Sequence, residues 1–498
     1  MSILDRTQLN SSGKLHLLAK SSLCQAYGDI SQLSIEFNVS RKVIYKSKKD
    51  AQDILSAALT PAGNSKQINV DTHQLKRTIV ALSIAGVNSI RSIENMIPII
   101  YPGVTCSFGS IQALQIEAQT NAQAFNRTVE LSNIDSGAID EVFCQGEPVL
   151  AGIDLDSGYV FSLAHELYRD GDTWASTLNK AKSQGLDLKH IVKDGATGMA
   201  KGVKEVFPLV EQRDDAFHAL YITTKSISKV EKRAYRHIEQ EHKLTRDIEK
   251  AKGDEKANLV AELCLVSEAC RKAVIRYDFA EAGYRYLHRA LNSVHTNTHF
   301  HLMSPNMAQT LLKLSVRCLK KSRHPDCSNA ARYIKNRLRG LTLATADFYQ
   351  KQKALSQDYS PDLVALACYF FEYKRSLKKI SAKKLPAVHT CMLRAYHYLR
   401  QALEDNECDT LMKKVEKSLD KRHRASSAIE GFNALLRPYM YVRKGVSQGF
   451  LELFKAWHNL RIRRNGKHQG TSALGVLTGI PTGDWLTILG YPPSSVTH

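Results

Sequence analysis

One stretch of this chain restricts its possible folds more than any other, because its apolar periodicity changes there from helical to strand-like. Three short β-type runs at 138–143, 148–154 and 159–163 follow one another through connections of hairpin length that contain glycine. Two amphipathic helices at about 173–182 and 197–206 then alternate with two more strand-like runs. The order β-β-β-α-β-α-β predicts a mixed five-stranded sheet with helices.

Two acidic residues stand at informative points of this order. Asp140 lies in the first strand-like run. Asp194 follows the fourth run, 186–192, and precedes the turn-prone segment 195–198. The fifth run, 210–214, completes the element order of an RNase H-like domain, a fold that carries one acid on its first strand and a second at the end of its fourth. The sequence therefore predicts an α/β RNase H-like catalytic domain.

Two other aspartates compete with Asp140 for the first position. Asp154 and Asp156 also lie near a strand end, but a first strand at Asp154 would leave only one further strand before the helix, where three strands are needed in all. Asp140 is therefore favoured, and Asp154 is expected to cap a hairpin turn. The neighbouring Glu141 is expected to point to the opposite face of its strand, because side chains alternate along a strand.

A third carboxylate, Glu430, lies in a segment that is predicted to be helical. Carboxylates that are distant in sequence and meet in one fold are what a two-metal phosphoryl-transfer site requires, because Mg²⁺ prefers oxygen ligands. We therefore expect Asp140, Asp194 and Glu430 to form one metal site. Asp214 and Asp215 are the main alternatives for a metal role, although their position at a strand end suits structural hydrogen bonds as well.

The rest of the chain is predicted to be mostly helical. Residues 221–424 would form a large all-α insertion in the catalytic domain, with a break near 252–254. The expected domains are 1–65 (helix-turn-helix), 66–132 (a second helix-turn-helix-like domain), 133–220 (first part of the catalytic core), 221–424 (all-α insertion) and 425–498 (last helices of the core and a basic tail).

The N-terminal segment has the pattern of a helix-turn-helix. A short helix at 30–37 and a turn at 38–40 lead into a basic helix at 41–49, for which Ser40 is a suitable N-cap. A recognition helix needs one apolar face that packs on its own domain and one basic or polar face that enters the DNA groove. Its DNA-binding candidates are Arg41, Lys42, Lys46, Lys48 and Lys49. A helical hairpin without a role in DNA binding is the alternative for this unit and for the second one.

The net charge favours a polyanionic partner. The formal charge is +20, of which residues 1–132 contribute +4 (13 Lys and Arg against 9 Asp and Glu) and residues 409–498 contribute +8 (14 against 6). Such a surface attracts nucleic acid and gains affinity by releasing counterions, although charge alone fits a merely basic protein equally well. Further DNA-binding candidates are Ser107, Ser110, Arg437, Arg443, Lys444, Arg461, Arg463 and Arg464.

Other classes of protein are disfavoured. No apolar run approaches the ~20 residues that a membrane-spanning helix needs, and the N-terminus lacks the pattern of a secretory signal. The ten cysteines contain no Cys-x-x-Cys pair, which argues against a zinc ribbon and a disulfide framework. We expect a cytoplasmic protein without a membrane partner.

Taken together, these motifs resemble those of bacterial insertion-sequence transposases of the DDE type. The matching segments are short, but they follow one another in the order typical of the family. Together with the N-terminal units they extend over nearly the whole chain. The segments are 139–143, 148–154, 192–195, 212–218, 426–433, 436–437 and 457–459. One departure is the distance of 236 positions between Asp194 and Glu430. The resemblance implies that the intervening insertion helps to hold the transposon end and assemble the synaptic complex.

The resulting hypothesis is a Mg²⁺-dependent DNA strand transferase, for which Mn²⁺ is expected to substitute. Asp140 would bridge two ions, Asp194 would hold one and Glu430 the other. The partners would be double-stranded DNA, as terminal repeats and as target, and further copies of the chain in a homodimer or larger assembly associated with the bacterial nucleoid. The alternatives are a catalytically inactive, domesticated transposase that regulates through DNA binding, and an RNase H-like nuclease without strand transfer.

Overall fold

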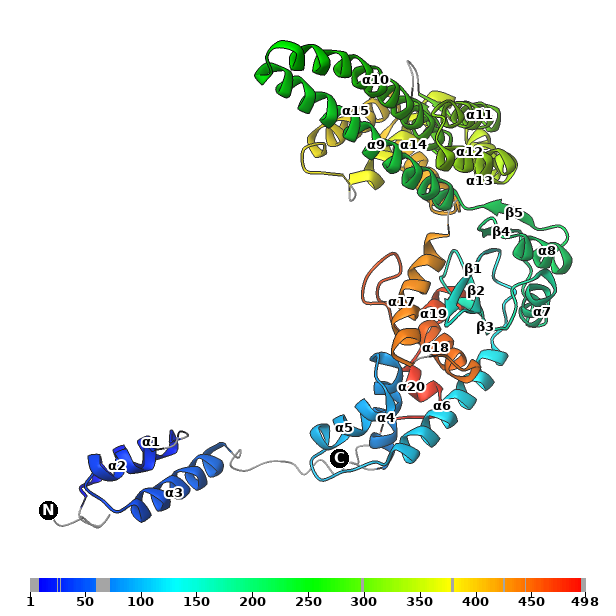
Figure 1. The fold of residues 1–498 in the computed structure, drawn as a ribbon. Coiled ribbons are helices and arrows are strands. Elements are labelled where there is room, and N and C mark those ends of the chain that lie inside the picture. The colour runs from blue at the N-terminus through cyan, green and yellow to red at the C-terminus, as the bar shows by residue number, and fades with distance from the viewer. Residues whose placement is uncertain are drawn as a thin grey trace. The chain divides into compact units, whose positions relative to one another are not determined.

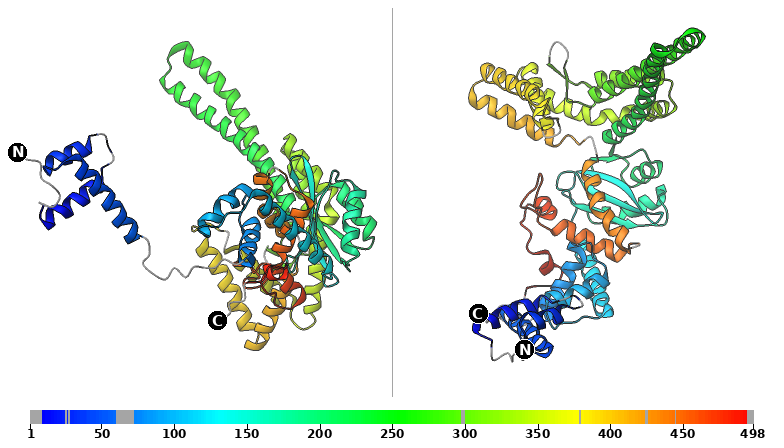
Figure 2. Two further views of the ribbon diagram at one scale, coloured as in Figure 1. Left: turned by 90° about the horizontal axis from the view of Figure 1, so that it is seen from below. Right: turned by 60° about the vertical axis from the view of Figure 1, so that its left-hand side comes forward.

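The computed structural model describes residues 9–24, 26, 28–59, 72–296, 300–377, 380–423, 426–443 and 445–493. They belong to two compact units, Met1–Thr72 and His73–His498. No helix in these described segments is both long enough and apolar enough to cross a membrane. Figures 1 and 2 show the order of the elements along the chain.

The first unit contains a cluster of three helices, namely α1 (Ser11–Ser22), α2 (Asp29–Glu36) and α3 (Arg41–Leu59). They enclose a small core in which Leu17, Leu33 and Ile44 are buried. The turn between α2 and α3 passes through Asn38, whose φ of 51° lies in the left-handed region that asparagine tolerates. The Ser40 hydroxyl accepts a hydrogen bond from the Val43 amide at 3.4 Å, as an N-cap does. Helix α3 extends ten residues beyond the predicted helix 41–49.

Three helices follow the first unit, namely α4 (Thr72–Ala85), α5 (Ile90–Ile100) and α6 (Phe108–Thr128). Ser89 and Ser107 are the N-caps of α5 and α6. Helix α6 packs against α18 (Gln448–Leu460).

The predicted mixed five-stranded sheet is present. It consists of β1 (Ser136–Cys144), β2 (Glu147–Asp154), β3 (Val160–His165), β4 (His190–Lys193) and β5 (Glu211–Asp214). The strand order is β3-β2-β1-β4-β5. The hairpin-connected neighbours pair antiparallel, whereas β1–β4 and β4–β5 pair parallel across helical connections. Strand β4 is shorter than the predicted run 186–192: Leu186 and Leu188 are buried in the core but precede the strand.

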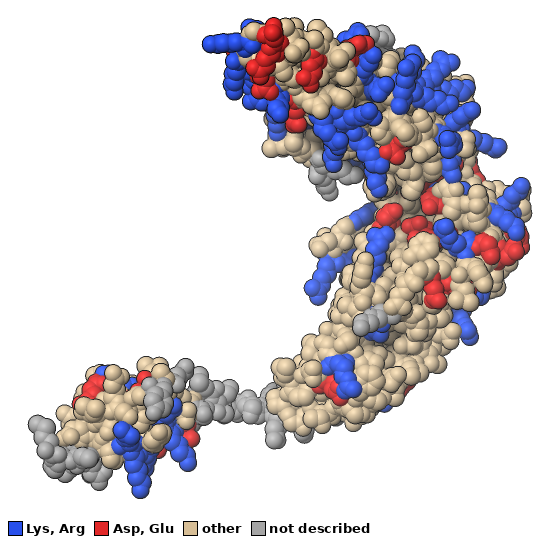
Figure 3. Space-filling model, in the orientation of Figure 1, with Lys and Arg blue, Asp and Glu red and all other residues tan. Residues whose placement is uncertain are grey.

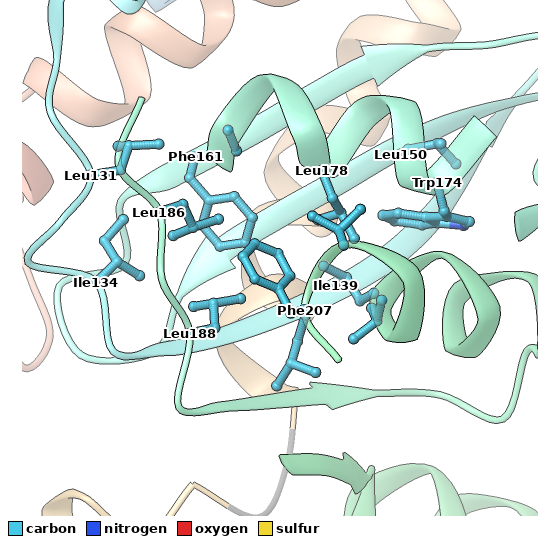
Figure 4. Close-up of a cluster of buried hydrophobic side chains, with 14 of the residues drawn as sticks. Leu131, Ile134, Ile139, Leu150, Phe161, Trp174, Leu178, Leu186, Leu188 and Phe207 are labelled. Carbon is cyan, nitrogen blue, oxygen red and sulfur yellow. The ribbon is translucent and has the colours of Figure 1, made fainter. Parts of the chain in front are cut away.

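Helices α7 (Gly171–Lys182) and α8 (Thr197–Val206) cover one face of the sheet. Figure 4 shows the resulting core, in which Ile139 and Leu150 of the sheet lie with Trp174 of α7 and with Phe207. Helix α17 (Ser427–Arg443) contacts β1 and β2. Because side chains alternate along β1, Ile139 faces the α7–α8 core while Asp140 faces α17.

The free edge of the sheet at β3 is covered by side chains of α18. The Asn459 side chain accepts a hydrogen bond from the Val160 amide at 2.8 Å and donates one to the Val160 carbonyl at 3.0 Å. Lys455 donates to the Phe161 carbonyl at 3.0 Å. Gln448 accepts from the His165 amide at 2.9 Å and donates to a further β3 carbonyl. Helix α18 therefore satisfies backbone groups that another strand would otherwise pair with.

The long insertion between β5 and α17 is mostly helical. Its helices are α9 (Ala216–Lys250), α10 (Gly253–Ala290), α11 (Pro305–Lys321), α12 (Pro325–Asn336), α13 (Leu338–Leu355), α14 (Pro361–Ser376), α15 (Leu385–Ala402) and α16 (Asp405–Asp420). The expectation of an all-α insertion was wrong in one place: β6 (Val294–Thr296) and β7 (Phe300–Leu302) form an antiparallel hairpin. Helix α14 packs on this hairpin, so tertiary contacts select strand conformation there.

The insertion has two apolar cores. One forms where α9 to α12 meet, and the other surrounds α14. Lys and Arg side chains gather over α11 to α13 on the face that Figure 3 shows. After α17 and α18, the chain ends with the short helices α19 (Ala473–Thr478) and α20 (Trp485–Ile488).

Candidate active site

Strand β1 presents Asp140 to helix α17. The Asn433 side chain, which is fully buried, donates a hydrogen bond to Asp140 Oδ2 at 2.7 Å. The Glu141 amide donates to Asp140 Oδ1 at 2.9 Å. Glu141 itself points to the other face, as predicted, where its carboxylate accepts hydrogen bonds from Trp174 Nε1 at 3.1 Å and from Arg169 at 2.7 Å.

The register of the sheet brings Asp194 next to Asp140. Strands β1 and β4 are parallel neighbours, and their last paired residues are Ile139 and Lys193. Asp140 and Asp194 each follow one of these residues, so the two carboxylates leave adjacent strands at the same level. Asp194 Oδ1 accepts a hydrogen bond from the Ala196 amide at 2.8 Å, which shapes the turn into α8.

Glu430 belongs to the first turn of α17. It precedes Asn433 by three residues, and residues at this spacing share a face of a helix. Because Asn433 contacts Asp140, Glu430 also faces β1, and its charge acts on Asp140. The serine four residues before Glu430, Ser426, anchors this turn: its hydroxyl donates to the buried Asp215 carboxylate at 2.6 Å, and its carbonyl accepts from the Glu430 amide at 3.0 Å.

Asp140 is the electrostatic centre of the site. Burial raises the pKa of Asp140 to about 7, and the charges of Glu430 and Asp194 act in the same direction, while the Glu141 amide opposes the shift. All three carboxylates are half-buried. A negative cluster of this kind favours either a proton or a cation.

The chemistry of this donor set fits a hard divalent cation, because it consists of carboxylate oxygens that repel one another. As the side chains stand, the described segments contain no group of three or more His, Cys, Asp or Glu residues arranged to hold a metal ion. Asp140, Asp194 and Glu430 would therefore have to turn toward one another to share an ion.

Of the two alternative ligands, Asp215 has a structural role. It is 2% exposed, and besides Ser426 its carboxylate accepts a hydrogen bond from the Phe217 amide at 2.7 Å, as the N-cap of α9. Asp214 lies between two cations, with 3.7 Å to Lys193 Nζ and 3.6 Å to Arg337 Nε. Burial raises the pKa of Asp214, and these two cations counteract part of that effect.

The insertion contributes a residue to the site that sequence reasoning missed. Arg337, between α12 and α13, donates a hydrogen bond to the Gly195 carbonyl at 2.8 Å, next to Asp194. A Cβ atom on Gly195 would lie 2.2 Å from this guanidinium, and one on Gly340 would lie 1.9 Å from the Asp214 carboxylate. Both glycines therefore permit the close approach. Nothing in the sequence connects positions 142 residues apart.

The aspartates of the β2–β3 turn are structural. Asp154 accepts a hydrogen bond from the Ser157 amide at 2.8 Å, which confirms its expected role as a turn cap. Asp156 Oδ1 lies 3.2 Å from His423 Nε2, and this hydrogen bond lowers the pKa of Asp156 to about 2. His423 lies in the connection between α16 and α17, so the pair ties that connection to the sheet.

The predicted DNA-binding residues divide into three groups. The exposed ones are Arg41, Lys42, Lys46, Lys49, Ser107, Ser110, Arg437 and Arg464. Four others contact the protein itself. Lys48 donates to the Cys24 carbonyl at 2.6 Å, and Arg443 donates to the Ser83 carbonyl at 3.0 Å while stacking on Phe450. Arg463 donates to the Gly158 carbonyl at 3.3 Å, and Arg461 stacks on Trp457.

These contacts give Lys48 and Arg443 roles in packing, because each side chain is held by a backbone carbonyl of its own unit. Ser107 caps α6 and shares a hydrogen bond with Ser110. Lys444 lies outside the described residues.

Comparison with known proteins gives similarity to one family model and to solved structures. Residues 368–475 match a family described as "Family of unknown function (DUF6399)". The sequence has no match among curated proteins. Among solved structures, the chain is similar to the "Drosophila P element transposase strand transfer complex", with 11% identity, a TM-score of 0.28, and coverage of 80% of this chain and 99% of that chain. At this TM-score the similarity does not establish a common fold.

Proposed function

We propose that this protein is a DNA transposase with an RNase H-like catalytic core, in which Asp140, Asp194 and Glu430 hold Mg²⁺ for DNA cleavage and strand transfer. One observation carries the proposal: Asp140 within β1, Asp194 directly after the parallel neighbour β4, and Glu430 on α17 share one electrostatic cluster. Because a transposable DNA element has two ends, we propose that at least two copies of the protein act together. A strand-transfer assay on DNA ends with Mg²⁺ tests the activity.

Each residue of the site has a distinct part in this proposal. When bound, a pair of divalent ions stabilises the attacking and leaving oxygens of an in-line displacement. Asp140 would contact both ions, Asp194 one and Glu430 the other. Asn433 would orient Asp140 through the hydrogen bond to Oδ2. Arg337 would fix the loop after Asp194, as outer-sphere partners of metal ligands do.

The pKa of Asp140 predicts a pH dependence. The carboxylate must be ionised to bind metal, and its pKa is raised to about 7 by burial and by the nearby acids. Cleavage should therefore fall as the pH is lowered through 7. Because a cation favours the ionised form, the midpoint should move to lower pH as Mg²⁺ is increased. Cleavage rates measured from about pH 5.5 to 8.5 at two Mg²⁺ concentrations test this. A pH midpoint that is the same at both Mg²⁺ concentrations would contradict it.

Arg337 gives a test of the insertion's role at the site. Arg337→Ala should lower the cleavage rate by about 10–100-fold and raise the Mg²⁺ concentration needed, because a residue that orients a ligand loop is lost. Arg337→Lys should recover part of the loss through the Gly195 carbonyl. The matched control is Arg332→Ala, one turn earlier on α12. Equal Mg²⁺ requirements in Arg337→Ala and wild type would mean that Arg337 does not position Asp194.

The first unit, Met1–Thr72, is proposed to recognise the ends of the transposable DNA element. Arg41 and Lys42 start α3 and are exposed, as base-contacting residues of a recognition helix must be. The double substitution to Ala should weaken binding to the terminal repeat by roughly 1–3 kcal/mol for each lost base contact and weaken binding to random DNA far less. The control removes two cations of α1, Lys14 and Lys20. Equal losses on both DNAs would show that Arg41 and Lys42 contact only phosphates.

A further inference from the structure

A cleft lies between the C-terminal end of α18 and the segment that leads into α20. Its volume is about 950 Å³. The stretch from the end of α18 lines it with Trp457, Leu460 and the basic segment 461–464, and the segment that leads into α20 lines it with Thr482, Gly483, Asp484 and Trp485. Small-ligand sites typically have volumes of roughly 300–1,000 Å³, and the mixed polar and apolar lining of this cleft suits a ligand with both a charged and an aromatic part.

The cations of this cleft lack acidic partners. No carboxylate among the described residues forms an ion pair with Arg461, Arg463 or Arg464. The Arg461 guanidinium lies over the Trp457 ring at 4.4 Å, and its Nε is buried without a hydrogen-bond partner in the described part of the chain. Both side chains are half-buried, and this burial lowers the pKa of Arg461 and of Arg463.

The one carboxylate in the cleft is already engaged. Asp484 pairs with Arg77 at 2.7 Å and accepts a hydrogen bond from the Thr487 amide at 2.9 Å as the N-cap of α20. It therefore does not neutralise the arginines of the segment 461–464. A partly desolvated positive charge without a counter-charge favours an anionic ligand.

We propose that this cleft binds an unpaired nucleotide of a DNA strand, with the base against Trp485 and the phosphate at Arg461 and Arg464. Aromatic side chains beside cations are the usual components of single-strand sites, because bases stack and phosphates pair with Arg. A base that is paired in a duplex has no free face to offer Trp485. The inference rests on the proposed function, since the splayed end of a cleaved element would supply such a nucleotide.

Tryptophan fluorescence tests the proposal directly. The chain has three tryptophans. Trp174 is buried in the core of the sheet, whereas Trp457, which is 7% exposed, and the more accessible Trp485 both line the cleft. Full-length protein in EDTA is titrated with a short oligothymidine and, separately, with a blunt duplex of equal charge. We expect saturable quenching by the single strand and little by the duplex. Trp485→Phe should retain the fold and remove most of the quenching, because Trp457, the other tryptophan of the cleft, is almost fully buried.

Arg464→Ala should weaken the quenching titration about tenfold and reduce its salt dependence, because one phosphate contact is lost. The matched control is Lys256→Ala on α10, which should leave the titration unchanged. Equal quenching by the duplex, undiminished quenching in Trp485→Phe, or an Arg464→Ala titration identical to wild type would each overturn the proposal. Because no divalent ion is present, a failure of DNA cleavage does not affect the result.

Discussion

Asp140→Asn is expected to abolish DNA cleavage and strand transfer while leaving DNA binding intact. The substitution removes a charged oxygen ligand from the centre of the carboxylate cluster, and with it the stabilisation of charge in the transition state. The loss of a single electrostatic contact of this kind reduces rates by roughly 10²–10³-fold, and the loss of a metal ligand should cost at least as much. Asp194→Asn and Glu430→Gln should have the same effect.

Asp154→Asn is the matched control, since Asp154 is a buried aspartate of the same sheet whose oxygens serve only the β2–β3 turn. It should retain most of the activity. Double substitutions within the set should lose little more than single ones, because residues that act as a unit are not additive. An active Glu430→Gln variant would mean that another residue is the third ligand, and Asp214, whose charge interacts with that of Asp194, would be tested next.

Asn459→Ala should strongly destabilise the protein. The fully buried Asn459 side chain satisfies both backbone groups of Val160 on the edge of the sheet. Alanine would leave a buried N–H and a buried C=O without partners, at about 1–3 kcal/mol each. Thermal or urea unfolding measures the loss. Asn459→Asp should also be destabilising, because a carboxylate accepts from the amide but cannot donate to the carbonyl.

The control for this prediction is Asn406→Ala, an exposed asparagine in the first turn of α16. It should change the free energy of unfolding by less than about 0.5 kcal/mol. A similarly small change for Asn459→Ala would contradict the role assigned to α18, namely that its side chains take the place of a sixth strand beside β3.

The sheet could be predicted because its information is local. Hairpin-length turns fix the antiparallel pairs, and the order of strands and helices predicts that the first and fourth strands are neighbours. The relation of Asp140, on the first strand, to Asp194, at the end of the fourth, follows from this order. Glu430 could be proposed only from its family-like motif, since its approach to Asp140 depends on how α17 packs on β1 and β2.

What could not be predicted depends on contacts between distant segments. The β6–β7 hairpin forms against α14, and the approach of Arg337 to Gly195 requires the insertion to be folded. Arg443 has the composition of a DNA-binding residue, and only the structure reveals that its guanidinium is directed to the Ser83 carbonyl. A charge pattern does not distinguish an exposed cation from one that joins two helices.

The most direct test of the central claim is the position of Mn²⁺ in crystals of the protein bound to a DNA end, read from anomalous scattering. The account predicts peaks beside Asp140, with one also ligated by Asp194 and another by Glu430. Peaks that involve Asp214 or Asp215 instead, or no peak near Asp140 at a Mn²⁺ concentration that supports cleavage, would contradict it.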